Sequence, residues 1–400
     1  MKVFYTGNIC SDEFFNGISK NQNFPPSYAQ LKLEKNIIEG FQSIGVSVDA
    51  FGQYPIRSYP GNKKMYLKKN KEIDGKSRII NPPMVNILIL KQFFQSVFTF
   101  FQFFYWILKN RREEKIYFSY SVYPPVTLIC LLLAKVFKIK TITYVSEVPK
   151  LRLYHNQNSV IRKGLMKLNT SLSMFMSGKF NYYIYTTEQT NDFFKAEKEN
   201  YVVIEGMTSI SKETIFNKKK NIYGYPYVTM YAGGINKQNG IELLIDVWEK
   251  MGSSFILWIF GSGDYVEELK KRIINMKNVI YYGNVAHEKI TQKEKEADLL
   301  INPRFTSGAY TEYSFPSKII EYLESGTPII SSKLKGIPEE YFNYIFPLAG
   351  DVNAITKQLK TIFTEQQIIA EKNSELGFYF VKNKKSPEEQ MKKVYKLLKN

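Results

Sequence analysis

The chain has 400 residues, a formal net charge of +18 and only two cysteines, Cys10 and Cys130. This length exceeds what one hydrophobic core usually serves, so we expect two domains. Two cysteines exclude a disulfide framework and a cysteine-rich zinc site, and they predict a reducing compartment. The positive charge favours an anionic partner, such as nucleic acid, an acidic membrane surface or a phosphorylated substrate.

The first half of the chain alternates short strands with helices. Strands at 1–6 and 45–51 flank a helix at 31–40, whose apolar residues roughly keep helical spacing. The N-terminus has no long apolar segment, so we expect no signal peptide and a cytoplasmic protein. The series continues with strands at 116–120, 141–145, 181–186 and 201–204 and an apolar helix at 126–137. Alternating strands and helices predict a parallel, doubly wound sheet.

Residues 93–108 are nearly all apolar and aromatic, and Lys109, Arg111 and Arg112 follow at once. The run is too short to span a bilayer, which requires about 20 apolar residues. It predicts either a core helix of the first domain or an interfacial helix lying among lipid headgroups. Residues 161–180 mix leucine and methionine with basic residues and add support for the interfacial alternative.

A second α/β series follows a looser, lysine-rich stretch at 209–225. We therefore expect a first domain at 1–206, a linker at 207–226, a second domain at 227–380 and a C-terminal helix at 381–400. Three strands of the second domain, at 227–231, 255–260 and 279–282, end in glycines. Such glycines can be tight turns, but the carboxyl ends of parallel strands also form the ligand-binding edge of open α/β sheets.

Residues 314–330 place a lysine and a carboxylate at the start of an amphipathic helix that Gly326 ends. Ser317 can cap this helix, whose N-terminus favours anions, and Lys318 adds a positive charge. Glu321 lies one turn further on the same face, where its two oxygens can accept hydrogen bonds from a vicinal diol. Phosphate beside ribose suggests a sugar nucleotide. The alternative is that Lys318 and Glu321 simply pair in solvent.

Together with the strand ends Tyr231–Lys237, Phe260–Asp264 and Ala297–Arg304, this motif makes the chain resemble GT-B glycosyltransferases of the retaining, glycogen-synthase-like family four. The resemblance implies two Rossmann-like domains facing a cleft, and a C-terminal helix packing back across them. It also implies a nucleotide-sugar donor held by the second domain, an acceptor and membrane held by the first, and retention at the anomeric carbon. Many such enzymes build bacterial capsule, exopolysaccharide or O-antigen units on a lipid carrier.

The resemblance also assigns residues around the donor. Glu321 matches the second glutamate of the family's Glu-x7-Glu pattern, which takes the ribose hydroxyls. Tyr313 stands where the first glutamate would be, unless Glu312, one residue away, replaces it. Ser314, Phe315 and Ser317 belong to the segment whose backbone meets the diphosphate and sugar in the family. Pro316 removes one backbone donor from that segment.

Gly233 and Gly234 match the family's glycine turn under the phosphates, but the arginine and lysine that often follow are absent here. Phosphate charge would then be met by Lys318, Lys237 and Arg304. These cations would stabilise the departing nucleoside diphosphate. Val285 lies in the family's base-binding loop, although the base itself is not assigned.

In the first domain, Ser146-Glu147 replaces the His-Asp pair of many relatives. Glu147 could orient the acceptor hydroxyl or act as a base, or it could be a simple loop carboxylate, and His155 lies close enough in sequence to reach the cleft. Retention without a placed nucleophile implies front-face displacement, in which the leaving phosphate helps deprotonate the acceptor. With no Asp-x-Asp signature, we expect metal independence and no cofactor beyond the nucleotide-sugar co-substrate.

The resulting hypothesis is a glycosyltransferase that moves a sugar from a nucleotide donor, with UDP among the candidates, to a lipid-linked or growing polysaccharide acceptor. It would act in the cytoplasm, peripherally on the inner, anionic face of the cell membrane, and no motif predicts nucleic-acid binding. Two alternatives remain: a sugar-nucleotide epimerase of the same fold, which needs no acceptor, and a non-catalytic binder of anionic glycan or membrane.

Overall fold

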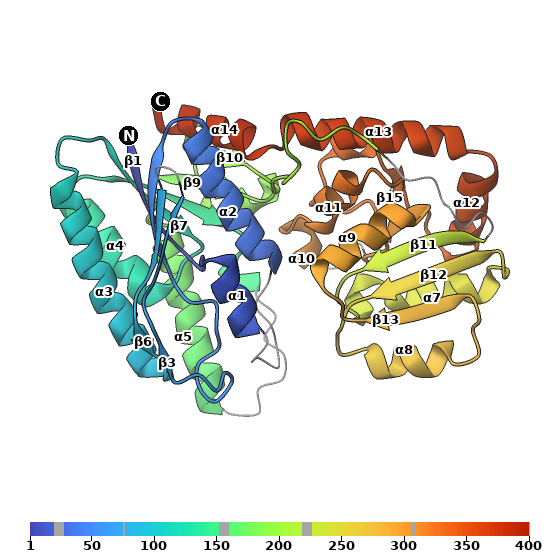
Figure 1. Cartoon of the computed structure of the whole chain (residues 1–400), viewed down its shortest axis with the longest axis horizontal. Helices are drawn as coiled ribbons and strands as arrows, with labels where there is room; N and C mark the ends of the chain where they lie inside the picture. The colour runs from blue at the N-terminus through green and yellow to red at the C-terminus, as the bar shows by residue number, and fades with distance from the viewer. Residues whose placement is uncertain (20–27, 75–76, 152–159, 218–225, 306–308, 400) are drawn as a thin grey trace. The chain divides into compact units, whose positions relative to one another are not determined.

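The computed structural model describes residues 1–19, 28–74, 77–151, 160–217, 226–305 and 309–399 (Figure 1). It divides into two compact units, one of Met1–Met207 with Pro387–Asn400 and the other of Thr208–Ser386. The predicted linker is therefore not a separate part, because its residues 208–217 belong to the second unit. Its residues 218–225 lie outside the described ones.

The first unit is an open sheet whose strands run in the order β10-β9-β8-β7-β1-β2-β5-β4. Every neighbouring pair is parallel except β4 with β5. The strands are β1 (Lys2–Gly7), β2 (Ser47–Gly52), β4 (Asn70–Asp74), β5 (Ser77–Asn81), β7 (Lys115–Tyr120), β8 (Lys140–Val145), β9 (Tyr182–Tyr185) and β10 (Tyr201–Val203). β3 (Tyr66–Leu67) and β6 (Met84–Val85) form a separate antiparallel pair. The doubly wound sheet predicted from the sequence is confirmed.

Successive residues of β1 point to opposite faces of the sheet, and both sets of side chains are apolar. Helices therefore cover both faces. Val3 and Tyr5 pack with one set of helices, and Phe4 packs with the other. The first set is α1 (Asp12–Ser19), α2 (Tyr28–Ser43) and α14 (Pro387–Lys399). The second set is α3 (Leu88–Lys109), α4 (Pro124–Val136) and α5 (Val160–Ser177), followed along the chain by the short α6 (Asn191–Phe194).

The C-terminal helix differs from the prediction of one element at 381–400. Residues up to Lys384 end α13 (Gln367–Lys384) in the second unit, and α14 starts separately at Pro387. Pro387 lacks a backbone donor and disfavours a helical residue before it, so a new helix begins there. α14 packs so closely on α2 that a Cβ on Gly40 would lie 2.3 Å from the Pro387 carbonyl oxygen.

The second unit is a fully parallel sheet in the order β13-β12-β11-β14-β15-β16. Its strands are β11 (Tyr227–Ala232), β12 (Phe255–Phe260), β13 (Val279–Gly283), β14 (Leu299–Asn302), β15 (Ile329–Ser331) and β16 (Phe346–Pro347). One face is covered by α7 (Ile241–Lys250), α8 (Val266–Ile273) and α12 (Val352–Thr364). The other is covered by α9 (His287–Glu296), α11 (Lys318–Ser325) and α13, while α10 (Ala309–Glu312) precedes α11.

The aromatic run at 93–108 forms most of α3, which buries some of its aromatic side chains in the core, as predicted for a core helix, and exposes others. Phe103 and Trp106 are buried in the core, whereas Phe93, Phe101 and Tyr105 are each at least 60% exposed. No helix in the described ranges is long and apolar enough to cross a membrane.

Candidate functional site

The strand order of the second unit reverses between β11 and β14. From β11 the chain adds β12 and β13 on one side, and then β14, β15 and β16 on the other. In open α/β sheets, ligands bind outside the carboxyl ends of the two strands where the order reverses. Gly233 and Gly234 follow β11 at this point, and Arg304 follows β14. The predicted donor residues of the second unit therefore gather at one sheet edge.

The glycines at this edge let two turns touch backbone to backbone. A Cβ on Gly261, whose φ is +133°, would lie 1.8 Å from the Gly233 carbonyl oxygen, and one on Gly263 would lie 2.1 Å from that of Ile235. The Gly233 N–H donates to the Phe260 carbonyl at 3.0 Å. The Gly234 carbonyl accepts from the Tyr231 hydroxyl at 2.9 Å. The close packing of these turns thus explains why residues 261 and 263 are glycines. The N–H of Gly233 makes its hydrogen bond within the fold.

The start of α11 differs from the prediction in one respect. Ser317 has helical backbone angles, φ −52° and ψ −27°, and its side chain makes no capping hydrogen bond. A capping side chain needs an extended backbone to reach the N–H groups of the first turn, so the prediction that Ser317 caps α11 is wrong. The predicted end of the helix is confirmed, because Gly326 adopts φ +69° and donates its N–H to Leu323.

Lys318 forms an ion pair with Glu321 one turn further along α11. It also lies 3.7 Å from Oε1 of Glu294, a buried residue of α9. The side chain of Lys318 is 27% exposed and that of Glu321 is 13% exposed, so both groups are partly open to a ligand. Glu294 was not found from the sequence, since it lies on the charged helix α9 and nothing local signals its burial.

The two carboxylates keep Lys318 charged. Burial opposes its charge, but Glu321 and Glu294 outweigh burial and raise the pKa of Lys318 above its usual value. A protonated lysine at the carboxyl edge of a parallel sheet, next to a half-buried carboxylate, can take an anion and a hydroxyl-bearing group together. The predicted pairing of Lys318 with Glu321 is present, yet it is not the solvent-exposed pair of the alternative interpretation.

The other predicted donor residues lie at the same edge with different surroundings. Lys237 pairs with Glu242 at 3.2 Å and remains 67% exposed. Phe315 is buried, with its ring 5.3 Å from that of Tyr341. Glu312 pairs with Lys335 at 3.2 Å. The remaining predicted residues, all half-buried, are Val285, Arg304, Tyr313 and Ser314.

The first unit has its own switch point, between β1 and β7. A pocket of ≈ 190 Å³ lies there, with Thr6, Asn8 and Gln53 among its lining residues. Ser121 also lines it and holds a left-handed backbone with φ +58°, a strained conformation that clusters at functional sites. These residues were missed, although Asn8, Gln53 and Ser121 each directly follow a buried strand.

The predicted pair Ser146 and Glu147 of the first domain can be placed relative to this pocket. The hydroxyl of Ser121 bonds that of Ser146 at 2.7 Å, so Glu147 follows directly on a residue tied to the pocket. Glu147 is half-buried at the carboxyl end of β8. His155 lies outside the described residues.

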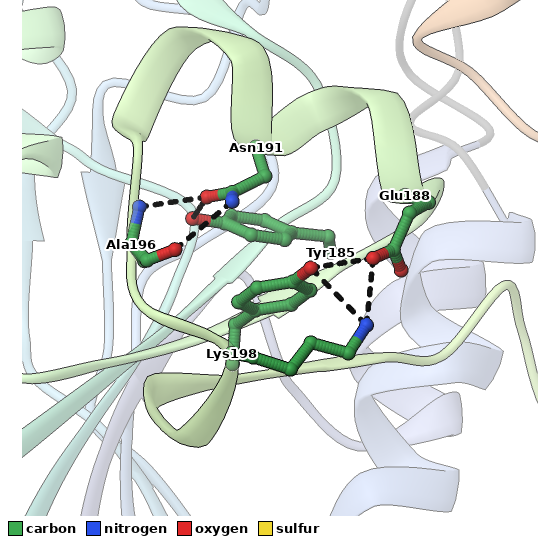
Figure 2. A network of polar contacts seen from close by, with 6 residues as sticks. Tyr185, Glu188, Asn191, Ala196 and Lys198 are labelled. Carbon is green, nitrogen blue, oxygen red and sulfur yellow. Dashed lines mark hydrogen bonds and ion pairs between the residues drawn. The ribbon is translucent and has the colours of Figure 1, made fainter.

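A network of hydrogen bonds connects the segments between β9 and β10 of the first unit (Figure 2). Lys198 donates to Glu188 at 2.7 Å and to the Tyr201 hydroxyl at 3.2 Å. Asn191 bonds the backbone of Ala196 in both directions, at 2.8 and 3.0 Å. The network ties the end of β9 to the start of β10, so we assign these polar groups to the fold.

Beneath the switch point of the first unit lies a fully buried carboxylate, Glu34 of α2. It accepts hydrogen bonds from the Tyr5 hydroxyl at 2.9 Å, the Gln30 amide at 2.9 Å and the Asn8 backbone at 3.2 Å. Although these bonds favour the charged form, burial dominates and raises the pKa of Glu34 to about 7. Glu34 thus supports Asn8, a residue of the pocket.

This raised pKa predicts a pH-dependent stability. The pKa of Glu34 rises from 4.5 to about 7 on folding, so the folded chain binds the extra proton between these values. The stabilisation is fully present below the lower value and is lost as pH rises through 7, at a cost of roughly 3 kcal/mol. In urea titrations at pH 4.5 to 8, the stability of wild type relative to Glu34→Gln should fall by about this amount. Glu39→Gln, an exposed change on α2, should show no such trend. A constant difference for Glu34→Gln would refute the prediction.

Comparison with known proteins agrees with the geometry of the second unit. Residues 226–365 match the family described as glycosyl transferases group 1. The second unit is a group 1 glycosyltransferase domain. The whole chain has the fold of GT-B glycosyltransferases, which confirms the predicted fold class and enzyme class. A search of the curated proteins found no match.

Solved structures resemble this glycosyltransferase over its full length. Sucrose-phosphate synthase from Thermosynechococcus elongatus is 15% identical with a TM-score of 0.63, covering 100% of this chain and 99% of the other. HepE from Anabaena, in complex with UDP and glucose, is 13% identical with a TM-score of 0.60, covering 99% of each chain. The lipopolysaccharide outer core galactosyltransferase WaaB is 15% identical with a TM-score of 0.58, covering 98% of this chain and 100% of the other.

Proposed function

We propose that this glycosyltransferase moves a sugar from a nucleotide sugar to a lipid-linked or growing polysaccharide acceptor, with retention at the anomeric carbon, in cell-surface glycan biosynthesis. The observation that carries the donor part is the Lys318–Glu321 pair at the start of α11, at the sheet edge where the strand order reverses between β11 and β14. A phosphate next to a ribose diol matches this arrangement of cation and carboxylate.

Each member of the pair has its own role in the proposed reaction. The oxygens of Glu321 accept hydrogen bonds from the ribose hydroxyls and orient the donor. The protonated amine of Lys318 stabilises the negative charge that develops on the leaving diphosphate as its bond to the sugar breaks. The leaving phosphate then takes the proton of the attacking hydroxyl on the same face of the sugar. HepE is known in complex with UDP and glucose, which makes UDP-sugars the first donors to test.

The proposed acceptor is lipid-linked, and the proposed location is the cytoplasmic, anionic face of the cell membrane. Two features support this location: the net charge of +18 and the large aromatic side chains that α3 exposes. In the first unit, Glu147 follows Ser146 at the edge of the hydroxyl-rich pocket, where it would orient the acceptor hydroxyl.

The test combines a panel of nucleotide sugars with two readouts, thermal stability and release of nucleoside diphosphate. One donor should raise the melting temperature, and its diphosphate should be released faster when a lipid-linked glycan is added. Conversion of the nucleotide sugar without acceptor would instead identify an epimerase. No response to any donor, with or without acceptor, would refute the proposed function.

We also propose that transfer does not require a metal, because the protonated Lys318 would neutralise charge on the diphosphate in the proposed donor site. Protein treated with EDTA should release diphosphate from the preferred donor at the same rate as untreated protein. The control is the treated protein supplied with Mg²⁺ or Mn²⁺. A loss of activity in EDTA that either ion restores would show that a divalent cation performs the charge neutralisation assigned to Lys318.

A further inference from the structure

The three helices on one face of the first sheet have a marked charge bias. α3, α4 and α5 together contain no aspartate and no glutamate, whereas each carries basic residues. They follow one another across the sheet, with α4 in contact with both α3 and α5 (Figure 1). Their outward sides therefore form one surface, which we call the α3–α5 face.

Each helix turns a stripe of large apolar side chains outward at helical spacing. On α5 the stripe repeats every three or four residues, and on α4 every four. Its members are Leu165, Leu168, Leu172 and Phe175 on α5, Leu128, Leu132 and Val136 on α4, and Phe101, Tyr105 and Leu108 on α3. All are more than 40% exposed. Exposed apolar side chains gathered on neighbouring helices are typical of an interaction site.

A groove of ≈ 840 Å³ opens on this face between α4 and α5. Its apolar wall includes Leu128, Leu132 and Phe175, and its basic lining is Lys135, Lys138, Lys140 and Lys179. The Lys179 amine lies 4.8 Å over the Phe175 ring, so cation and apolar surface meet directly. No acidic side chain is among the lining residues, all of which belong to the described ranges.

We propose that this groove binds the phosphate headgroup of an anionic phospholipid while the flanking stripes enter the outer part of the bilayer. Lys135, Lys138 and Lys179 supply charge complementarity to the phosphate, whereas the Lys140 amine donates to the Leu398 carbonyl at 2.8 Å. The lysine alkyl chains can follow apolar surface to the headgroup level. Lysine is depleted at protein–protein interfaces, which favours lipid over a partner protein here. The proposal rests on the proposed membrane location and goes beyond it, by naming the surface and the lipid class.

The test measures flotation of the full chain with vesicles of phosphatidylcholine, with and without phosphatidylglycerol, in the absence of donor. Wild type should float with the anionic vesicles, and less so as salt rises. Each lysine near an anionic surface contributes about 1 kcal/mol, so Lys135→Gln with Lys179→Gln should weaken this binding roughly thirtyfold. The matched control is Lys357→Gln with Lys360→Gln, two exposed residues of α12, which should bind as wild type does.

A second variant tests the apolar part. Leu132→Gln with Phe175→Gln should also lose the anionic vesicles, while its melting temperature and diphosphate release stay those of wild type, because both side chains point outward. Equal weakening by the α12 control would overturn the groove proposal and leave membrane binding intact. Failure of wild type to float would overturn both. A concentration-dependent dimer without lipid, abolished by Leu132→Gln with Phe175→Gln, would overturn the proposal in favour of a second copy of the chain.

Discussion

Glu321→Ala is expected to lower kcat/KM for the preferred nucleotide sugar by roughly 10²- to 10⁴-fold, because it removes two hydrogen bonds from ribose hydroxyls to the carboxylate, each of which contributes about 1.5–3 kcal/mol. Glu321 is only 13% exposed, so water replaces these bonds poorly. The substitution also leaves Lys318 with Glu294 as its remaining carboxylate neighbour across the site. We therefore expect the donor-dependent rise in melting temperature to disappear as well.

The measurement compares diphosphate release and thermal shift in three variants. Glu321→Gln should lower kcat/KM by roughly 10- to 10²-fold, less than Glu321→Ala, since an amide offers one acceptor oxygen in place of two. Glu375→Ala, an exposed change on α13, is the matched control and should behave as wild type. If Glu321→Gln kept full activity, hydrogen bonding of the diol by this carboxylate would be refuted.

Lys318→Met is expected to destabilise the chain by roughly 3–5 kcal/mol, because it removes the cation beside a buried glutamate. Glu294 is 1% exposed on α9, and Lys318 also pairs with Glu321. Loss of the amine leaves two carboxylates near each other in a poorly solvated place. We expect a lower urea midpoint for unfolding and, in the same variant, loss of diphosphate release.

A second change separates these two effects. Adding Glu294→Gln to Lys318→Met removes the buried charge, so the urea midpoint should recover most of its loss. Activity should stay low, because the diphosphate still lacks its cation. Activity that returned with stability would show that Lys318 acts through the fold alone. Lys360→Met on α12 provides the control for the loss of a surface lysine.

Much of the fold could be predicted from local pattern. The strand at 255–260 coincides with β12, because it reads as an unbroken apolar run, and the strand at 141–145 differs from β8 by one residue, because it consists of β-branched and aromatic residues. Gly326 could be predicted as a helix end because few other residues adopt its left-handed backbone. Ser317 was assigned wrongly by the same local logic, since serine suits a cap by type, but its backbone is already helical.

The partners of the site residues could not be predicted. Glu294 meets Lys318 only because α9 and α11 cover the same face of the sheet. Glu34 acquires its raised pKa from burial beneath β1, and on α2 it looks like any helical glutamate. The Ser121–Ser146 contact joins the ends of β7 and β8 across 25 residues of the chain, and it depends on the left-handed backbone of Ser121.

The sequence by itself determined the α/β fold, the glycine-rich strand ends and the cation–carboxylate pair of α11, because periodicity and turn chemistry act over a few residues. Tertiary structure alone decided that Lys318 stays charged between two carboxylates, and that three acid-free helices expose one surface with a lysine-lined groove. Burial and charge pairing depend on which helices share a face of a sheet. That choice is made by the packing of the whole domain.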